Sequence, residues 1–368
     1  MAKKSVQAAV EVKLDELLPV LRLAEKFAAK NDLVAAYKHI YFRKDGGVRA
    51  YDGTSGAILR TPWPIGDGVG VPAGPALRLF EALKSDYDTV TVSSTDKRLV
   101  VSVGGDKENY PLPILTKDTT EVPMDFLMRD APAPSVDGLD ADFWIAVASV
   151  EMTVCEDDGK PTLAGVWWGP DGAMISTDNF RATRAYPKLA PRPCPDPAGM
   201  LIPRMFLSRL KDVRANAVTA TESEVWAHTD QGSIFDRRPS EHFPGPAVAG
   251  IFNDLLGARG ESPVVSVVDG DAAARTLGRV VQFSDPATHK VRIDLTKDRR
   301  AKVTVETPGG TVPTAFVELS AEYPGPAATI RVNGAHLQEA LVHVGREFHV
   351  SESKSKLFFV DESRRVEH

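Results

Sequence analysis

The sequence predicts an α+β protein made of three copies of one domain, each with two helices packed on antiparallel sheets. Three segments share a pattern in which a hydrophobic strand end is followed by leucines at helical spacing. Their central leucines, Leu77, Leu207 and Leu337, lie at equal steps of 130 residues (77 to 207 and 207 to 337). A second helical segment recurs three times at nearly the same step. Self-similarity at a fixed step indicates a repeated structural unit, so the chain is expected to be a tandem array.

The helical pattern predicts six helices, two in each copy. The leucine-bearing helices are expected within the segments 71–83, 202–213 and 332–344, each of which opens on a strand end, and the others at residues 14–30, 140–155 and 271–283. Each helix of the second set begins at or beside an Asp, which favours the N-cap or first turn. A helix with one apolar stripe must bury it against another layer, so both helices of a copy are expected on one sheet face.

Short stretches rich in Val, Ile and aromatic residues predict roughly eight strands in each copy, and turn pairs such as Asp171-Gly172 separate them. The clearest strands are expected at residues 48–51, 89–92, 99–103, 163–168, 225–228, 291–295, 302–306 and 357–360. A Pro-rich linker is expected at residues 131–135 and a second linker, with Gly and charge, at residues 252–263. The domains are therefore placed at residues 1–130, 136–252 and 260–368.

Composition restricts the classes of protein and site. The two cysteines, Cys155 and Cys194, show no spacing typical of zinc or of a disulfide framework. No signal-peptide core and no apolar run long enough for a membrane span is found, so a cytoplasmic protein without membrane association is expected. The net charge of −6 gives no overall attraction to nucleic acid.

The cations, however, recur on the helices, on five of the six and away from the apolar stripes. The candidate DNA-facing residues are Arg22, Lys26, Lys30, Arg78, Lys84, Arg204, Arg209, Lys211, Arg214, Arg275 and Arg279. A solvated helix face is the alternative for any single stripe. Recurrence in an acidic chain favours a surface that contacts DNA phosphates without reading sequence, with an exterior that repels DNA.

No constellation typical of an enzyme is found. The chain lacks a phosphate-binding glycine loop, a Gly-x-Ser-x-Gly elbow and a His-Glu-x-x-His motif. The acidic stretch at residues 156–159 and Asp178 are interpreted as turn residues, and neither a metal nor another cofactor is expected. Two other readings stay open: a β-rich virion or scaffold protein with repeated domains and no DNA role, and a hydrolase with an unrecognised site.

Four segments of the middle copy resemble the bacterial and phage DNA polymerase III beta subunit, the sliding clamp. They are residues 161–166 (PTLAGV), 175–182 (ISTDNFRA), 201–204 (LIPR) and 243–244 (FP). The second segment is similar to the family's Ala-Thr-Asp-Gly-His-Arg-Leu-Ala, with Asn179 and Phe180 in place of Gly and His, and Ala182 in place of Leu. The resemblance extends weakly over nearly the whole chain.

The resemblance implies a non-catalytic processivity factor. In the family, two three-domain subunits close head to tail into a ring, helices line the hole for duplex DNA, and polymerase and clamp-loader peptides dock in a pocket. Carried over, that pocket would be lined by Thr177, Asn179, Phe180, Arg181 and Pro244. The family's Met-Pro-Met-Arg-Leu-like tail is replaced by Arg365-Val366-Glu367-His368. The pocket is therefore incomplete, remodelled, or specific for a different partner motif.

Overall fold

The structure is a computed structural model of the 368-residue chain. It describes residues 9–31, 34–66, 68–95, 97–105, 107–115, 124–157, 159–187, 192–213, 215–239, 242–260, 262–296, 300–305, 316–325, 327–345, 347–350, 357–361 and 366–367. The contacts group into two compact units, Met1–Leu139 with Met205–Ser240, and Asp140–Arg204 with Glu241–His368. In the described part of the chain, the helices are all too short or too polar to cross a membrane.

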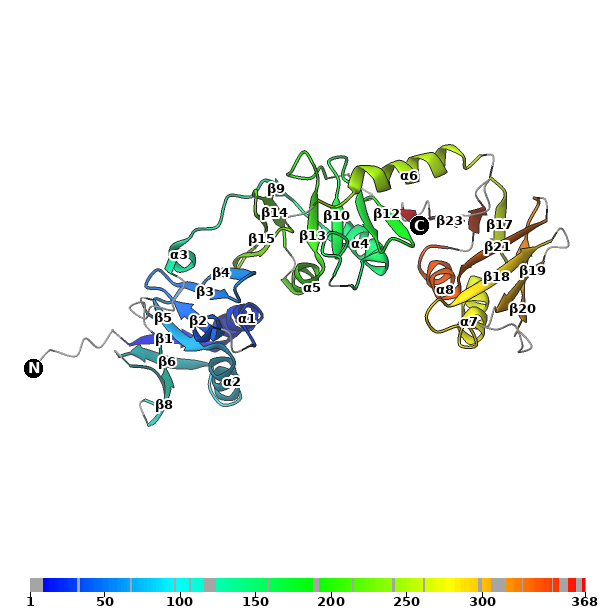
Figure 1. Ribbon diagram of the computed structural model, residues 1–368. Coiled ribbons are helices and arrows are strands. Elements are labelled where there is room, and N and C mark those ends of the chain that lie inside the picture. Colours follow the sequence, from blue (N-terminus) through cyan, green and yellow to red (C-terminus); the bar gives the residue numbers. More distant parts are fainter. Residues whose placement is uncertain are drawn as a thin grey trace, which may run out of the picture. The chain divides into compact units, whose positions relative to one another are not determined.

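The first unit holds two antiparallel sheets (Figure 1). The larger has the order β5 (Val69–Pro72), β2 (His39–Phe42), β3 (Gly47–Tyr51), β4 (Gly56–Arg60), β16 (Gly232–Arg237), β15 (Glu224–Thr229), β14 (Ala217–Ala220) and β9 (Val136–Asp137). The smaller has the order β1 (Val10–Lys13), β6 (Thr89–Ser94), β7 (Arg98–Val103) and β8 (Glu108–Pro113). Its helices are α1 (Leu14–Glu25), α2 (Ala73–Lys84), α3 (Met124–Met128) and α5 (Arg204–Val213), with a 3-10 turn at Ala35–Lys38.

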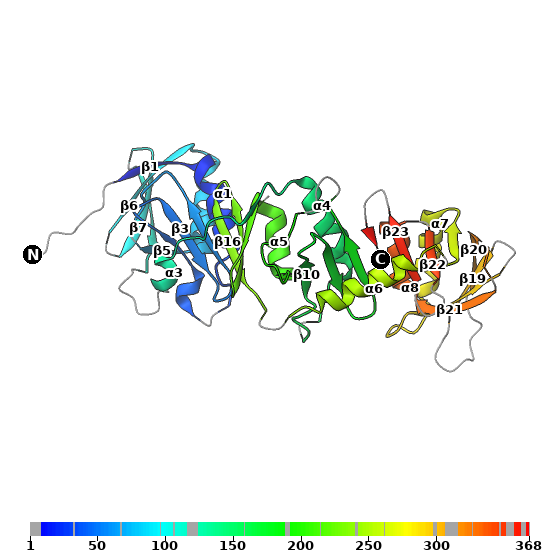
Figure 2. The same cartoon turned by 90° about the horizontal axis from the view of Figure 1, so that it is seen from above.

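Strands from distant parts of the chain meet within this unit. β4 and β16 pair antiparallel from Gly232 opposite Leu59 to Phe235 opposite Gly56, and Figure 2 shows β16 joining this sheet. A Cβ at Gly56 would lie 2.5 Å from the Phe235 ring, so only glycine fits there. Phe235 also stacks on the fully buried Trp226, with ring centroids 4.5 Å apart. One sheet therefore continues from the first third of the sequence into the middle third.

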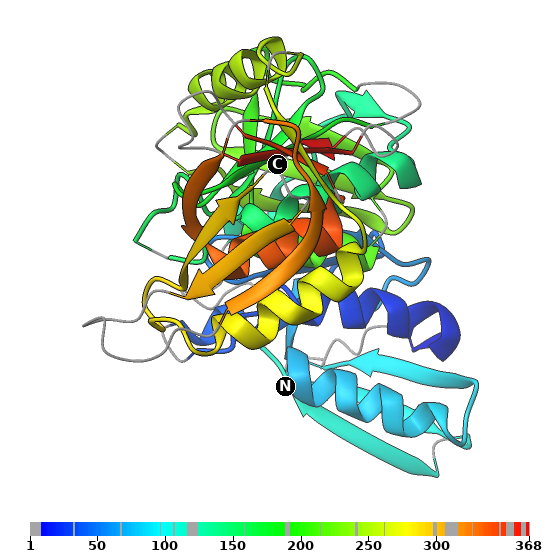
Figure 3. The same ribbon diagram turned by 90° about the vertical axis from the view of Figure 1, so that its right-hand side faces the viewer.

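The second unit contains one long antiparallel sheet. Its order is β13 (Met200–Pro203), β10 (Gly165–Trp168), β11 (Met174–Thr177), β12 (Ala182–Ala185), β24 (Val366–Glu367), β23 (Leu357–Asp361), β22 (Glu347–Val350), β17 (Val264–Val267), β20 (Phe316–Glu322), β19 (Arg300–Val305), β18 (Lys290–Leu295) and β21 (Ala328–Asn333). Its helices are α4 (Ala141–Val150), α6 (Gly245–Gly257), α7 (Gly270–Val281) and α8 (Gly334–His343), with a 3-10 turn at Glu151–Thr153. α7 and α8, yellow and orange-red in Figure 3, pack side by side.

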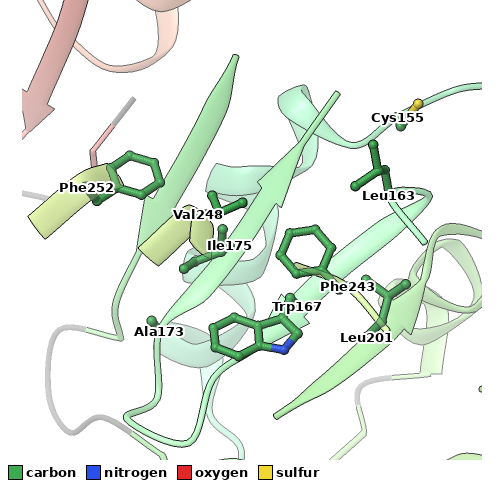
Figure 4. Packing of buried hydrophobic residues seen from close by; sticks show 9 residues of the cluster. All are labelled: Cys155, Leu163, Trp167, Ala173, Ile175, Leu201, Phe243, Val248 and Phe252. Atoms are coloured by element: carbon green, nitrogen blue, oxygen red, sulfur yellow. The ribbon is translucent and has the colours of Figure 1, made fainter. Parts of the chain in front are cut away.

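An aromatic pair organises the core beside α6 (Figure 4). Trp167 of β10 stacks on Phe243, with ring centroids 6.1 Å apart and planes 18° apart. Val248 and Phe252 of α6 join the same buried cluster. Gly245, the first residue of α6, packs so closely on Trp167 that a Cβ there would lie 2.3 Å from the indole. The missing side chain therefore lets the helix begin directly against the ring.

All six predicted helices are present, with shifted ends. α1 ends at Glu25, so Lys26 and Lys30 lie beyond the helix. α4 is capped by Asp140 as expected, because its carboxylate accepts from the Phe143 backbone N–H at 3.0 Å. α7 begins one residue earlier than predicted and is capped by Asp269.

The predicted linker at residues 252–263 overlaps a helix that was not predicted, because α6 continues to Gly257. The helix was missed because it begins with Gly245-Pro246 and contains Gly250 and Gly257, which have low helix propensity. Proline in the first helical turn is nevertheless compatible with a helix. The short helix α3 was also missed. The boundaries 1–130, 136–252 and 260–368 stay a prediction.

Candidate functional site

A tight turn between β11 and β12 carries most of the predicted peptide pocket. Asp178 Oδ1 accepts from the backbone N–H groups of Phe180 at 2.9 Å and Arg181 at 3.0 Å. The Thr177 hydroxyl donates to the Arg181 carbonyl at 2.8 Å and accepts from the Asn179 N–H at 3.1 Å. Asn179 has φ +80°, a left-handed conformation that asparagine tolerates better than most residues. This turn leaves the Phe180 side chain 84% exposed.

Arg181 ties the turn to α8. Its guanidinium donates from Nε to Asp178 Oδ2 at 2.9 Å and from Nη1 to Glu339 of α8. Burial works to raise the pKa of Asp178, but hydrogen bonds from Arg181 and two backbone amides outweigh it and hold that pKa below its usual value. Asp178 therefore stays ionised and acts as the turn's structural anchor, as its interpretation as a turn residue predicted.

A cavity of about 470 Å³ opens on one side of this turn. Its walls come from the turn, α6, the end of β21, α8 and β23. The apolar lining residues are Phe180, Ala182, Val248, Ile251, Phe252, Leu255, Val332, Leu337, Ala340, Leu357, Phe358 and Phe359. Ile251 is 45% exposed, so part of this apolar surface faces solvent. We call this the apolar cavity.

Polar groups at the apolar cavity include His336, in the first turn of α8. Burial is the main reason that the pKa of His336 is lowered, and the nearby positive charge of Arg181 lowers it further. Asn333 caps the same helix, accepting from the backbone N–H groups of Ala335 at 2.9 Å and His336 at 3.2 Å. His336 is therefore mainly neutral near pH 7, and the cavity wall at this point is uncharged.

A second cavity, of about 590 Å³, lies against the same turn. Phe180 and Arg181 line both cavities. The remaining lining residues of the second cavity are Glu151, Met152, Val154, Cys155, Glu156, Asp157, Lys160, Asp178, Glu339 and His343. We call this the acidic cavity, because carboxylates outnumber cations in its lining.

Of the five predicted pocket residues, the structure brings Thr177, Asn179, Phe180 and Arg181 together at the apolar cavity. Pro244 does not line it and is an exposed N-cap residue of α6. The apolar face of α6 was missed, although Val248, Ile251, Phe252 and Leu255 follow the i, i+3, i+4, i+7 spacing of an amphipathic helix. The residues of α8 and β23 that line the cavity could not be predicted from local sequence pattern, because only the tertiary fold brings these elements to the turn.

The predicted DNA-facing cations differ in their surroundings. Arg78, Arg275 and Arg279 are exposed on α2 and α7, and Lys30 is exposed beyond the end of α1. Arg22 is exposed and pairs with Glu81 of α2, with Nε 2.9 Å from Oε1. Exposed pairs of this kind leave the side chain available for a stronger anionic partner.

Other predicted cations are partly buried or lie near carboxylates. Lys84 contacts Asp15 at 3.0 Å and Asp88 at 2.7 Å. Arg204 lies 4.0 Å from Glu156. Lys26 is partly buried. Arg214 and the side chain of Lys211 lie outside the described residues.

Arg209 is turned inward within the first unit. Its side chain is 18% exposed, its Nη2 lies 3.0 Å from Asp52 Oδ2, and its guanidinium lies 4.6 Å from the Phe27 ring centroid. A guanidinium paired with a carboxylate and stacked on an aromatic ring is held in one geometry. Arg209 therefore joins α5 to α1 and the β3–β4 turn, and its contact with DNA stays a prediction.

The described residues contain no group of three or more His, Cys, Asp or Glu side chains placed to hold a metal ion. The arrangement on either side of Phe180 instead has the geometry of a binding surface: an exposed aromatic ring between an apolar and an acidic cavity.

Comparisons with known proteins identify the fold. No family profile matches the sequence, and no curated protein matches it either. Solved structures do match. The DNA polymerase III subunit beta sliding clamp from Pseudomonas aeruginosa bound to griselimycin is similar with a TM-score of 0.76 at 16% identity, covering 98% of this chain and 97% of that chain. The clamp from Bartonella birtlesii bound to griselimycin has a TM-score of 0.76 at 15% identity, and that from Caulobacter crescentus 0.74 at 18%, each covering 98% of both chains.

The chain therefore has the fold of the DNA sliding clamps. Within that class, its structural neighbours are bacterial DNA polymerase III beta subunits, and the likeness runs along nearly the full length of both chains. The predicted α+β fold class and the resemblance to these proteins are confirmed at the level of the fold.

Proposed function

We propose that this protein is a DNA sliding clamp, a processivity factor that encircles duplex DNA and tethers a replicative polymerase without catalysis. The observation that carries the proposal is the full-length likeness to bacterial beta clamps, with 98% of this chain covered. A protein that shares a single domain with a clamp would not align over its whole length. The alternative of a scaffold protein gives no reason for this likeness or for exposed cations on the helices.

Two chains would close head to tail into a ring, because a heterologous interface gives a closed ring when its rotation closes. The exposed helix cations Arg22, Arg78, Arg275 and Arg279 support a positively charged hole. Phosphate contacts carry no sequence information, so the ring would hold DNA and still slide. The net charge of −6 places the remaining surface in repulsion with DNA, which favours retention by topology over binding on the outside.

The two cavities beside Phe180 support a docking site for short segments of a polymerase and a clamp loader. The exposed Phe180 ring and the α6 face offer apolar area to a partner. Burying apolar surface is the main source of affinity in such contacts, at roughly 25 cal/mol per Å². Thr177 and Asn179 shape the turn that presents Phe180, and the predicted role of Pro244 would be limited to starting α6.

Encirclement of DNA is tested by an assay in which only the topology of the DNA decides whether the protein stays bound. The protein is mixed with linear DNA, the ends are ligated, and the complex is washed at high salt. A ring that has threaded over a free end is expected to stay on the ligated circle, to leave unligated DNA, and to be released when the circle is cut. Equal retention on circular and linear DNA would overturn the topological mechanism.

A further inference from the structure

We infer that the partner segment at this site is bipartite, with apolar side chains in the apolar cavity and a Lys or Arg in the acidic cavity. The inference rests on the proposed function and names the chemistry of the partner. It follows from the position of one residue, Phe180, between two cavities of opposite character.

Phe180 forms the ridge between the cavities. It lines both of them and is 84% exposed, and Arg181 also lines both. Asp178 fixes the backbone on which Phe180 stands through two hydrogen bonds from the turn's amides. A segment that covers the ring from the apolar side therefore comes directly to the edge of the acidic cavity.

The apolar cavity has room for large apolar side chains. Twelve of its lining residues are apolar, counting Phe180 itself, and they come from the turn and from β12, α6, β21, α8 and β23. Its cations Arg181 and Arg331 lie at the lining, but Arg181 is already bound to Asp178 and Glu339. Desolvating leucine or phenylalanine side chains here is the dominant source of affinity.

The acidic cavity has the opposite character. Its carboxylates are Glu151, Glu156, Asp157, Asp178 and Glu339, and its permanent cations are Lys160 and Arg181. Five carboxylates and two permanent cations leave an excess of three negative charges among these side chains. Arg181 offsets Asp178 and Glu339, and Lys160 lies 3.5 Å from Asp157.

Glu156 is the carboxylate best placed to meet a partner's cation. Its side chain is 91% exposed, and its contact with Arg204 is 4.0 Å long, the outer limit of an ion pair. The Asp157 side chain is 57% exposed and the Glu339 side chain is 44% exposed. An incoming Lys or Arg is therefore attracted to this cavity, whereas an incoming carboxylate is repelled.

The charge contact selects among partners more than it adds affinity. An exposed ion pair changes an affinity by roughly 1.5-fold to fivefold, and salt screens it over about 10 Å at 0.1 M. The apolar contact is insensitive to this screening. The apolar contact should therefore give an affinity that does not depend on salt. The preference for a cationic segment over an anionic one should weaken as salt is added.

The test uses three fluorescent synthetic peptides that carry the same two leucines, joined through a Gly-Ser spacer to two lysines, two serines or two glutamates. Binding to the full-length protein is followed by fluorescence anisotropy. The lysine peptide is expected to bind tightest and the glutamate peptide weakest, with a difference of roughly threefold to twentyfold that shrinks at high salt. Equal affinities for the three peptides, or no binding by any of them, would overturn the inference.

Two variants locate the effect. Glu156→Gln with Asp157→Asn is expected to remove most of the preference for lysine, and Phe180→Ala to weaken all three peptides alike. The matched control, Glu222→Gln with Asp254→Asn, makes the same charge change at exposed residues that line neither cavity. An equal loss in this control would mean that only net charge matters. Retention on circular DNA, measured on the same preparations, tests the proposed function separately.

Discussion

Arg209 of α5 and Asp52 of the β3–β4 turn form an ion pair in which Nη2 lies 3.0 Å from Oδ2 and both side chains are only 18% exposed. Asp52 uses its other oxygen to accept from the backbone N–H groups of Thr54 at 2.9 Å and Ser55 at 2.7 Å. The same carboxylate therefore shapes a turn in the first third of the chain and anchors a helix of the middle third. Arg209 Nη1 is buried and has no hydrogen-bond partner among the described residues, so the guanidinium relies on the ion pair that Nη2 forms with Asp52.

We expect Asp52→Ala to lower the free energy of unfolding by about 2–4 kcal/mol, because it leaves a mostly buried guanidinium without its carboxylate. Adding Arg209→Met should recover part of this loss, with a coupling of roughly 1–3 kcal/mol. Urea unfolding measures both values. Lys84→Met, which removes a cation from contacts with two well-exposed carboxylates, is the matched control and should leave stability nearly unchanged. A similar small change for Asp52→Ala would contradict the structural role of the pair.

Asp236 of β16 gives the first unit a specific pH dependence. Burial raises the pKa of Asp236 to about 6, with the Arg209 charge and hydrogen bonds from the Arg237 backbone and Ser55 acting against the rise. Since the folded-state pKa is raised, the protonated carboxyl favours the fold, and stability is lost as pH rises from about 4 through about 6. The contribution is on the order of 2–3 kcal/mol.

We therefore expect Asp236→Asn to be more stable than the parent at pH 8 and close to it at pH 4, as measured by urea unfolding. Burial lowers the pKa of His228 and His349, which makes stability fall as pH decreases, so the difference between variant and parent isolates Asp236. Asp254→Asn on α6, an exposed residue, is the control. A variant whose advantage is the same at both pH values would show that ionisation of Asp236 is not the cause.

Arg78, Arg275 and Arg279 are changed together to Gln. This variant should associate more weakly with linear DNA, measured before the DNA ends are ligated. Each lost phosphate contact should reduce the slope of log affinity against log salt by roughly 0.9. The control neutralises Lys44, Lys97 and Lys107, exposed cations that lie on turns and not on helices. If both triple variants change the slope equally, DNA responds to total charge and the helices do not form its contact surface.

Phe180→Ala should reduce binding of a polymerase-derived peptide and leave both subunit assembly and stability unchanged. The side chain is 84% exposed, so its removal leaves no core cavity, and stability should change by less than about 0.5 kcal/mol. Isothermal titration and urea unfolding on the same protein make the comparison. Failure of assembly in this variant would mean that Phe180 belongs to an interface between subunits.

Local pattern in the sequence predicted the helices better than it predicted which distant residues they contact. Leucine spacing located α2, α5 and α8, because a 3.6-residue period is a property of the chain itself. α6 was not predicted, because its glycines and proline have low helix propensity. The helical spacing is nevertheless present at Val248, Ile251, Phe252 and Leu255. Four of the residues in and beside the turn between β11 and β12 were predicted because residues 175–182 resemble a segment of the sliding-clamp family.

Ion pairs between residues far apart in the sequence could not be predicted from local sequence pattern. Arg209 was predicted to face DNA and Arg181 to line the peptide pocket, yet each forms an ion pair with a carboxylate that lies 157 and 158 positions away, respectively. Which carboxylate meets which guanidinium depends on how β4 pairs with β16 and how α8 packs on its sheet. Helical periodicity places a side chain on a face but does not identify what covers that face.

We propose that one chain supplies half of a closed ring. Sedimentation equilibrium of the full-length protein at micromolar concentration tests this most directly, because a chain with the three predicted clamp repeats needs a second chain to make six. We expect a single species with twice the mass of one chain, independent of concentration over this range. A species with the mass of one chain, or of three, would contradict the ring.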